Sequence, residues 1–238
     1  MDKIIIANWK NNPATLNEAK ELFSFESAEA KKYPNIKVAI CPPEKFFKEV
    51  ADSNPAYLGA QDFFWQLGEV VPAKYVLIGH SDRRYGLGET DEVINQKLKA
   101  ALAAGVTPVL LVGERNKNDD RKTVLEEQLT KSFANLLTSG VRKVLIAYEP
   151  VWAISTNPDA EPDIPENTLE AIRIIGQVLN SKFEILNSKL VYLYGGSVNK
   201  SNVADFLKHS EISGAVIGGA SLRKEEFAEI LKIVETLK

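Results

Sequence analysis

Short apolar runs alternate along the chain with longer stretches in which apolar residues recur every three or four positions. Several short runs, such as IIIA at 4–7 and VLLV at 109–112, are apolar at nearly every position. Parallel strands that are covered by helices on both faces have this pattern. Eight strands are predicted on this basis: Lys3–Trp9, Ile36–Cys41, Ala56–Gln61, Tyr75–Gly79, Thr107–Gly113, Lys143–Glu149, Leu190–Tyr194 and Gly214–Gly218.

Amphipathic runs fill most of the gaps between these strands. The first of them opens with Thr15 and Glu18 at the spacing of a capping box, a common start of a helix. Helices are predicted at about 15–32, 43–52, 88–104, 120–139, 165–182, 199–208 and 224–237.

The βα alternation runs through the whole chain and predicts an α/β fold with a parallel sheet. Eight units in one unbroken series favour closure into a single eight-stranded parallel (βα)8 barrel, one domain over residues 1–238. A six-stranded open sheet with extra edge strands is the alternative. The third βα loop is expected to be shortened, because 18 residues separate Gln61 from His80.

Composition narrows the class of protein. The net charge of −3 gives no electrostatic reason to expect nucleic acid or an anionic membrane as a partner. The opening MDKIIIANWK lacks the pattern of a signal peptide, and the single cysteine, Cys41, fits a reducing cytoplasm. One Cys and two His form no recognisable metal-ligand cluster, although counting does not exclude a carboxylate site for Mg²⁺. We therefore expect a cytoplasmic protein with no metal and no cofactor.

Polar residues follow several of the predicted strands. Asn8 and Lys10 lie at the end of the first, His80 after the fourth, and Glu149 at the end of the sixth. Each alone has an ordinary structural reading, such as a surface lysine, a helix cap or half of an ion pair. In a parallel barrel, however, the C-terminal ends of the strands surround one mouth, where active sites lie. Together these four residues indicate a site.

Two glycine pairs follow the seventh and eighth strands, and each precedes a serine. They are Gly195-Gly196-Ser197 and Gly218-Gly219, with Ser221 shortly after the second pair. Glycines at these strand ends allow backbone N–H groups to approach an anion closely, and this part of a barrel commonly binds phosphate. The predicted ligand therefore carries a phosphate group.

One carboxylate, one imidazole and one ammonium group suit the removal of a proton from a carbon next to a carbonyl. Glu149 would be the base, while His80 and Lys10 stabilise the enediolate that forms. A helix that starts after His80 would favour its neutral form.

Eight stretches of the chain resemble the triosephosphate isomerase family, and they extend over essentially its full length. The combination of AYEPVWAI with GHS-x-RR, in this order and separation, is the most specific of them. The stretches are ANWK (7–10), GAQDF (59–63), LIGHSDRR (77–84), GETDEVINQKLKAAL (88–102), VGE (112–114), AYEPVWAI (147–154), YGGSV (194–198) and IGGASL (217–222).

The resemblance implies a TIM barrel and an isomerase of glycolysis and gluconeogenesis that interconverts D-glyceraldehyde 3-phosphate and dihydroxyacetone phosphate. It implies Glu149 as the base, neutral His80 as the electrophile, and Lys10 and Asn8 as holders of the substrate oxygens. It also implies a mobile lid at about 150–162. The resemblance further places phosphate on backbone N–H groups and adds supporting residues near the site: Ser155, Ser197, Gly218 and Gly219 for the phosphate, and Ser81, Asp82, Tyr194 and Gly196 in support.

The chain departs from the family pattern within the lid and next to His80. Pro158 stiffens the second half of the lid. Ala160 and Tyr194 are retained, a pair that meets in the family when the lid closes. Asp82 replaces the usual Glu, and we expect its ion pair and proton relay to be weakened or replaced by a water, so that Asp82→Glu raises kcat/KM.

Assembly is the least determined feature. In the family the third loop reaches the neighbouring subunit's site and builds a dimer. The shortened loop and Asn11, where an apolar residue often packs, both weaken this contact. The expectation slightly favours a homodimer, with a monomer as the alternative.

Two other functions stay open at this point. One is a different phosphate-binding barrel enzyme, such as a sugar-phosphate epimerase or aldolase, for which only Lys10 is a candidate. The other is a barrel that binds sugar phosphates or a protein partner without turnover, supported only by the altered lid and interface.

Overall fold

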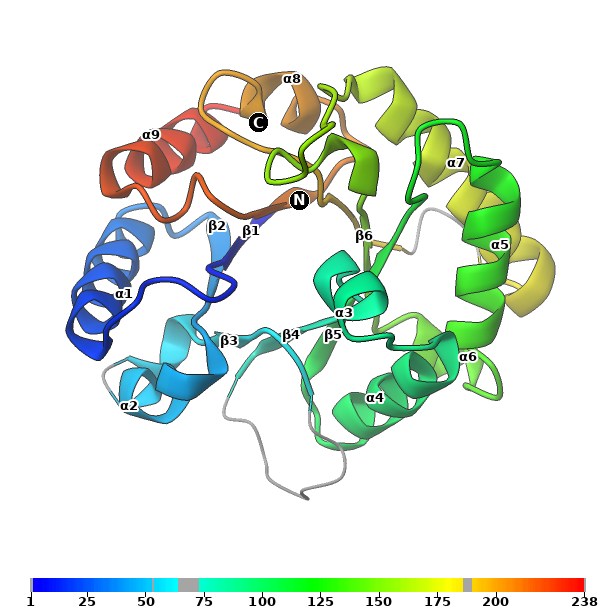
Figure 1. Ribbon diagram of the computed structural model, residues 1–238, viewed down its shortest axis with the longest axis horizontal. Coiled ribbons are helices and arrows are strands. Elements are labelled where there is room, and N and C mark those ends of the chain that lie inside the picture. Colours follow the sequence, from blue (N-terminus) through cyan, green and yellow to red (C-terminus); the bar gives the residue numbers. More distant parts are fainter. Residues whose placement is uncertain (1, 53, 64–72, 186–189, 238) are drawn as a thin grey trace.

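Eight parallel strands form the centre of the molecule. The computed structural model describes residues 2–52, 54–63, 73–185 and 190–237. The strands lie in the order β2-β1-β8-β7-β6-β5-β4-β3, and a parallel bridge between Ile40 and Leu58 links the two ends of this series into a ring (Figure 1). The strands are β1 Lys3–Asn8, β2 Ile36–Cys41, β3 Gly59–Ala60, β4 Tyr75–Ile78, β5 Thr107–Val112, β6 Leu145–Tyr148, β7 Tyr192–Tyr194 and β8 Gly214–Ile217. The predicted eight-stranded parallel barrel is confirmed.

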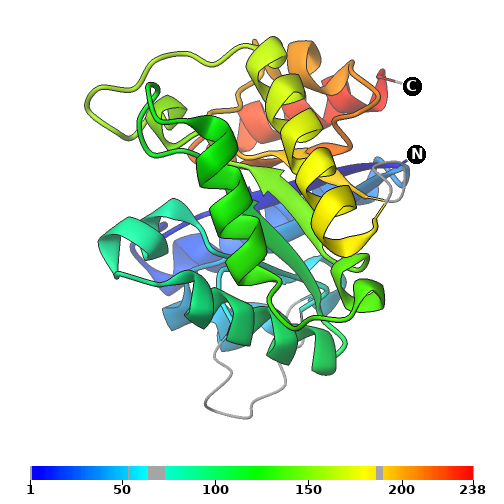
Figure 2. The ribbon, with the colours of Figure 1, turned by 90° about the vertical axis from the view of Figure 1, so that its right-hand side faces the viewer.

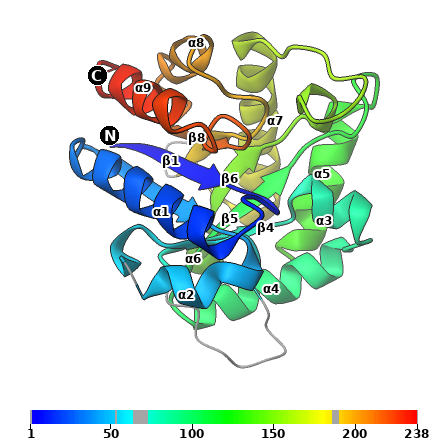
Figure 3. The ribbon, with the colours of Figure 1, turned by 60° about the vertical axis from the view of Figure 1, so that its left-hand side comes forward.

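Helices cover the outside of the ring. Figure 2 shows α5 and α7 side by side on one flank, and Figures 1 and 3 show α1 beside α9. The α-helices are α1 Leu16–Lys31, α2 Phe47–Ala51, α3 Ser81–Gly86, α4 Asp91–Ala103, α5 Arg121–Ser132, α6 Thr138–Val141, α7 Pro165–Phe183, α8 Val203–Leu207 and α9 Lys224–Glu235. Three short 3-10 helices are η1 Glu44–Phe46, η2 Pro55–Tyr57 and η3 Val151–Ala153. The capping box at the start of α1 is present, with Thr15 and Glu18 bonded reciprocally.

The strands are apolar throughout because both of their faces are buried. Along β1, Ile4 and Ile6 belong to a cluster that fills the barrel, whereas Ile5 and Ala7 pack outward against the helices. Side chains alternate between the faces of a strand, so the next inward position after Ile6 is Asn8. The same count along β6, from Leu145 through Ala147, reaches Glu149. The core pattern of two strands thus directs these two polar side chains into the mouth.

Most predicted elements differ from the structure by a few residues at their ends, and the third strand and the helix predicted at 120–139 differ in ways that have a clear physical reason. The third strand is only Gly59–Ala60, because Pro55–Tyr57 forms a 3-10 helix. Proline lacks the N–H that a strand interior requires. The predicted helix at 120–139 ends at Ser132, and Asn135 adopts a left-handed φ of 58° before the short α6 begins.

The shortened third loop falls mainly at 64–72, outside the described residues. Within the described part of the chain, no helix is long and apolar enough to cross a membrane.

Candidate active site

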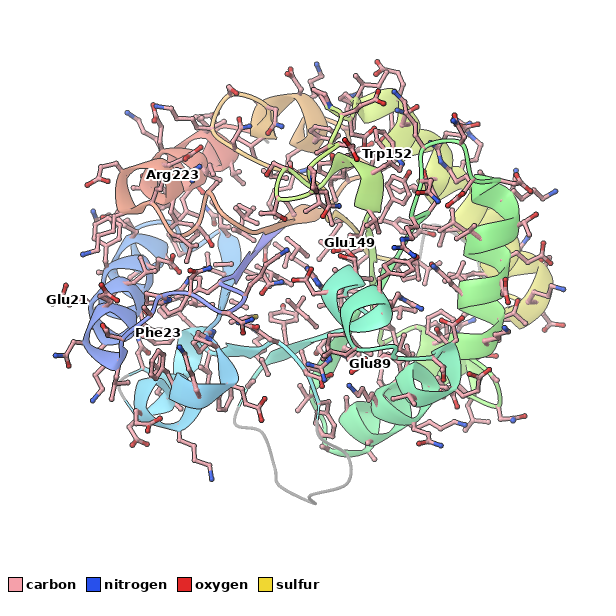
Figure 4. All side chains as sticks on the ribbon, viewed as in Figure 1. Glu21, Phe23, Glu89, Glu149, Trp152 and Arg223 are labelled. Atoms are coloured by element: carbon pink, nitrogen blue, oxygen red, sulfur yellow. The ribbon has the colours of Figure 1, made fainter. Side chains whose placement is uncertain are left out.

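The C-terminal ends of the strands surround a cavity of about 170 Å³. It is lined by all four of the side chains predicted to meet there: Asn8, Lys10, His80 and Glu149. The predicted phosphate residues line the same cavity: Ser155, Ser197, Gly218 and Gly219, together with Gly196. Residues from distant parts of the chain therefore share one site, with Glu149 near the centre of the ring in Figure 4.

Glu149 is 3% exposed and follows β6 directly. Its Oε2 accepts a hydrogen bond from the backbone N–H of Ser81 at 2.9 Å, and its Oε1 accepts one from the Ser81 hydroxyl at 3.2 Å. Burial raises the pKa of Glu149, while His80, Ser81 and Lys10 act in the opposite direction. A carboxylate with a raised pKa is a stronger base than an exposed one, and this suits proton abstraction.

His80 caps the N-terminus of α3. Its Nδ1 accepts the backbone N–H of Asp82 at 3.1 Å, so the ring proton is assigned to the other nitrogen. That nitrogen, Nε2, lies 3.1 Å from Oε1 of Glu149. The Nε2–H of this imidazole is therefore directed at the Glu149 carboxylate, and in this tautomer the ring can donate a hydrogen bond into the cavity.

Lys10 has a left-handed backbone with φ of 52°, which is rare for a residue with a long side chain. Its N–H donates to Oδ1 of Asn8 at 3.1 Å. Its carbonyl accepts Nε2 of Gln61 at 2.7 Å, and the same nitrogen donates to the Cys41 carbonyl at 2.9 Å. Gln61 thus ties the strained backbone of Lys10 to the end of β2. This residue was not among the predicted site residues, although its amide lies directly after the third strand.

Asp82 reaches the ammonium group of Lys10 directly, with 3.2 Å between Oδ2 and Nζ. The expectation that a water replaces this ion pair is therefore wrong. Its physical reason is placement: Asp82 lies in the first turn of α3, close enough for the shorter side chain to span the gap. The proton-relay role of Asp82 stays a prediction.

The two glycine pairs have different local environments. A Cβ on Gly218 would meet nothing within 4 Å, and one on Gly219 would meet only Arg223, at 4.0 Å. These two positions border open space, as an anion cradle requires. By contrast, a Cβ on Gly195 would press on the Tyr148 carbonyl, and one on Gly196 would overlap the ring of Tyr194. Packing therefore also requires glycine at the first pair.

The predicted lid segment, about 150–162, follows β6 and leads to α7. The N–H of Ser155, which the family resemblance assigns to phosphate, here donates to the Ser197 hydroxyl at 2.6 Å. The chain after β6 projects as an extended loop in Figure 2. Beside it, a second cavity of about 670 Å³ is bordered by Ser81, Asp82 and the lid residues 157–159.

Two acids, the buried Glu114 and the partly buried Asp163, make hydrogen bonds near the two ends of the predicted lid segment, and neither was predicted from the sequence. Glu114 is fully buried, and its Oε1 accepts the Tyr148 hydroxyl at 2.6 Å and the indole N–H of Trp152 at 3.1 Å. Asp163 accepts the backbone N–H of Ile164 at 2.8 Å. The side-chain partners of Glu114 are 34 and 38 residues away in the sequence, so spacing gave no signal for it, whereas Asp163 bonds mainly to its neighbours at the start of α7.

Tyr194 is buried below the site, with its ring stacked on Phe206 at 3.9 Å. Its hydroxyl is hydrogen-bonded to Asp163, and the N–H of Ala160 donates to the Asn157 carbonyl at 3.3 Å. The expected meeting of Tyr194 with Ala160 is therefore absent from this conformation, because both groups have other partners.

Comparisons with known proteins identify the family of the chain. The chain matches the family model described as triosephosphate isomerase over residues 3–234. It is 39% identical to the triosephosphate isomerase of Dehalococcoides mccartyi (strain ATCC BAA-2266 / KCTC 15142 / 195), over 98% of this chain and 97% of the relative. The enzymes named triosephosphate isomerase from Dictyoglomus turgidum and Rhodopirellula baltica are 36% and 34% identical, and the alignments cover 97% and 96% of this chain and 98% and 96% of the relatives. The chain therefore belongs to the triosephosphate isomerase family of enzymes.

Proposed function

We propose that this isomerase interconverts D-glyceraldehyde 3-phosphate and dihydroxyacetone phosphate by proton transfer through an enediolate. The observation that carries the proposal is the 3.1 Å contact between the Glu149 carboxylate and Nε2 of His80, in a cavity that also holds Lys10 and an open glycine cradle.

Glu149 acts as the base. Its carboxylate takes the proton from the carbon next to the carbonyl, and the C–H electron pair becomes the double bond of the enediolate. The carbonyl oxygen gains negative charge, which the N–H of His80 and the ammonium group of Lys10 stabilise. The His80 ring then moves the hydroxyl proton of the enediolate to the former carbonyl oxygen, so that the other oxygen becomes the new carbonyl. Glu149 returns its proton to the former carbonyl carbon, which completes the isomerisation, so no electrons leave or enter the substrate and no cofactor is needed.

The carboxylate must first leave Ser81. In this structure both oxygens of Glu149 accept hydrogen bonds from that residue, and these bonds must be given up before the carboxylate can reach a substrate carbon. Substrate binding supplies the interactions that draw Glu149 toward the reacting carbon. The mobile lid at about 150–162 then closes and excludes water, which strengthens these electrostatic interactions and protects the enediolate.

Backbone N–H groups of Ser155, Ser197 and Gly219, with Gly218 beside them, hold the phosphate of the substrate. For Ser155 this requires its N–H to exchange the Ser197 hydroxyl for a phosphate oxygen. The exchange links substrate binding to the position of the lid, since Ser155 is a lid residue.

A coupled assay with purified protein and D-glyceraldehyde 3-phosphate tests the proposal. Turnover to dihydroxyacetone phosphate supports it. Binding of the substrate without turnover, or turnover of a different sugar phosphate alone, would favour one of the other two functions.

We expect Asp82→Glu to change kcat/KM by less than about threefold, because the ion pair with Lys10 already forms at 3.2 Å and Asp82 is largely exposed. Asp82→Asn removes the pair and is expected to lower kcat/KM by roughly three- to tenfold. Steady-state kinetics on both variants provide the check. A tenfold higher kcat/KM in Asp82→Glu would instead mean that Asp82 fills the role of the usual Glu only weakly, as the sequence suggested.

A homodimer is the proposed assembly. Leu87 is 68% exposed and Tyr85 is 41% exposed, so the end of α3 presents apolar surface next to the active site. We expect sedimentation at micromolar concentration to give twice the chain mass of 26.3 kDa, and Leu87→Lys to shift the population toward one chain. A mass of one chain at every concentration would exclude the dimer.

A further inference from the structure

The active-site cavity has a second cation at its edge. Among the described residues that line it, the cationic side chains are Lys10 and Arg223. The ammonium group of Lys10 is already paired with Asp82. The chain carries a net charge of −3, so attraction of an anionic substrate depends on local cations. Arg223 lies after β8, at the start of α9, and Figure 4 labels it on the α9 side of the ring.

The guanidinium of Arg223 lies against the glycine cradle. Its Nη1 donates to the Gly219 carbonyl at 3.0 Å. It is also the nearest atom to a Cβ built on Gly219, at 4.0 Å, while Gly218 faces nothing within 4 Å. Neither glycine has a left-handed φ, so the absence of their side chains leaves open space and is not required by the backbone conformation. The guanidinium borders this space.

The guanidinium is accessible to a competing anion. Its Nε and Nη2 both lie 2.5 Å from Oε2 of Glu226, and the Arg223 side chain is 60% exposed while that of Glu226 is 15% exposed. Because the cation itself is exposed, a dianionic phosphate can reach it and compete with the carboxylate. Arginine also matches two oxygens of a phosphate at once, and its remaining N–H groups are available for a ligand.

We propose that Arg223 is a substrate-binding residue that pairs with the phosphate dianion, with Glu226 as the competing carboxylate that holds it when the site is empty. The assignment rests on the proposed function for the identity of the phosphate ester. It goes further by giving the cradle a side-chain cation besides Lys10. Since Arg223 lies at the edge, away from Glu149 and His80, its effect falls on binding and not on the chemical step.

Two variants with opposite expected effects test this assignment. Arg223→Gln should raise the inhibition constant of inorganic phosphate and the KM for D-glyceraldehyde 3-phosphate by roughly five- to fiftyfold, with kcat changed less than about threefold. Glu226→Gln should lower the inhibition constant of phosphate by a few-fold, because it releases the guanidinium. Turnover of D-glyceraldehyde, which has no phosphate, should be unaffected by Arg223→Gln.

Arg142→Gln is the matched control, since it removes the same charge from an exposed residue that precedes β6 at the opposite end of the barrel. The assignment is overturned if Arg223→Gln leaves both constants within about twofold, or if Arg142→Gln raises them equally. Loss of phosphate binding in Arg223→Gln, found with a wild-type protein that does not isomerise, would support the site and reject the proposed function.

Discussion

Glu149→Gln is expected to lower kcat by roughly a hundredfold to ten-thousandfold or more, with a much smaller change in KM. The amide keeps the size of the side chain and can still accept the N–H of Ser81, but it has no basicity at neutral pH. Among the described residues that line the cavity, Glu149 is the only carboxylate, so the variant leaves that lining without a carboxylate base. Steady-state kinetics in both directions measure the effect.

A stability measurement separates this loss from unfolding. The folded-state pKa of Glu149 is raised by burial, so the ionised group destabilises the fold at any pH above that pKa, and this cost disappears as pH falls below the ordinary value. Glu149→Gln should therefore have a Tm at neutral pH at least as high as that of the wild type. Glu127→Gln, in an exposed pair with Lys131, is the control and should keep wild-type kcat. Activity within tenfold of wild type in Glu149→Gln would remove Glu149 from the mechanism.

The pH profile gives a third measurement on the same residue. The base works only when ionised, so kcat/KM should fall as pH drops through the pKa of Glu149. Because burial raises that pKa, the acid limb should lie above the ordinary glutamate value of 4.5. An acid limb at or below that value would contradict the environment described for the carboxylate.

The residues that the sequence predicted well are those fixed by strand periodicity. Asn8 and Glu149 each continue the inward count of a strand whose earlier inward residues fill the barrel. Their convergence follows from parallel topology alone, since all C-terminal strand ends lie at one face. The glycine pairs were found for the same reason.

Residues that act through partners on other elements could not be found in this way. Gln61 matters because its amide bridges two carbonyls, on Lys10 and Cys41, and Glu114 because it collects donors from the β6 end and the lid. Sequence separation carries no information on such contacts. Arg223 was missed because it lies two residues beyond the glycine-serine motif, and only the turn after β8 brings it back over Gly219.

The direct ion pair between Lys10 and Asp82 shows a further limit of prediction from sequence. Loss of one methylene from the usual Glu suggested a gap, yet the left-handed backbone at Lys10 and the first turn of α3 bring the two charges within 3.2 Å. Whether a shorter side chain still forms an ion pair depends on the positions of the two backbones, and the sequence alone does not give these positions.

Lys10→Met is expected to reduce kcat/KM by about a hundredfold to a thousandfold or more, through both a lower kcat and a higher KM. The ammonium group is the charge nearest to where the enediolate forms, and methionine keeps much of the length and apolar stem without that charge. Lys10→Arg should recover part of the lost substrate affinity but little of the lost kcat, because its planar guanidinium places the charge differently. Steady-state kinetics with D-glyceraldehyde 3-phosphate measure these effects. The control is Lys20→Met, which removes the same charge from an exposed position of α1.

Folding of the Lys10→Met variant should be close to that of the wild type. Asp82 loses its partner but is 59% exposed, so the free energy of unfolding should change by less than about 1 kcal/mol. The strained φ of 52° persists, because Gln61 and Asn8 bond to the backbone of residue 10 and not to its side chain. An unaltered Tm with lost activity would show that the fold maintains this costly backbone conformation independently of the lysine charge. A large drop in Tm would instead mean that the ammonium group itself holds the turn, and the argument that hydrogen bonds to the backbone place Lys10 would fail.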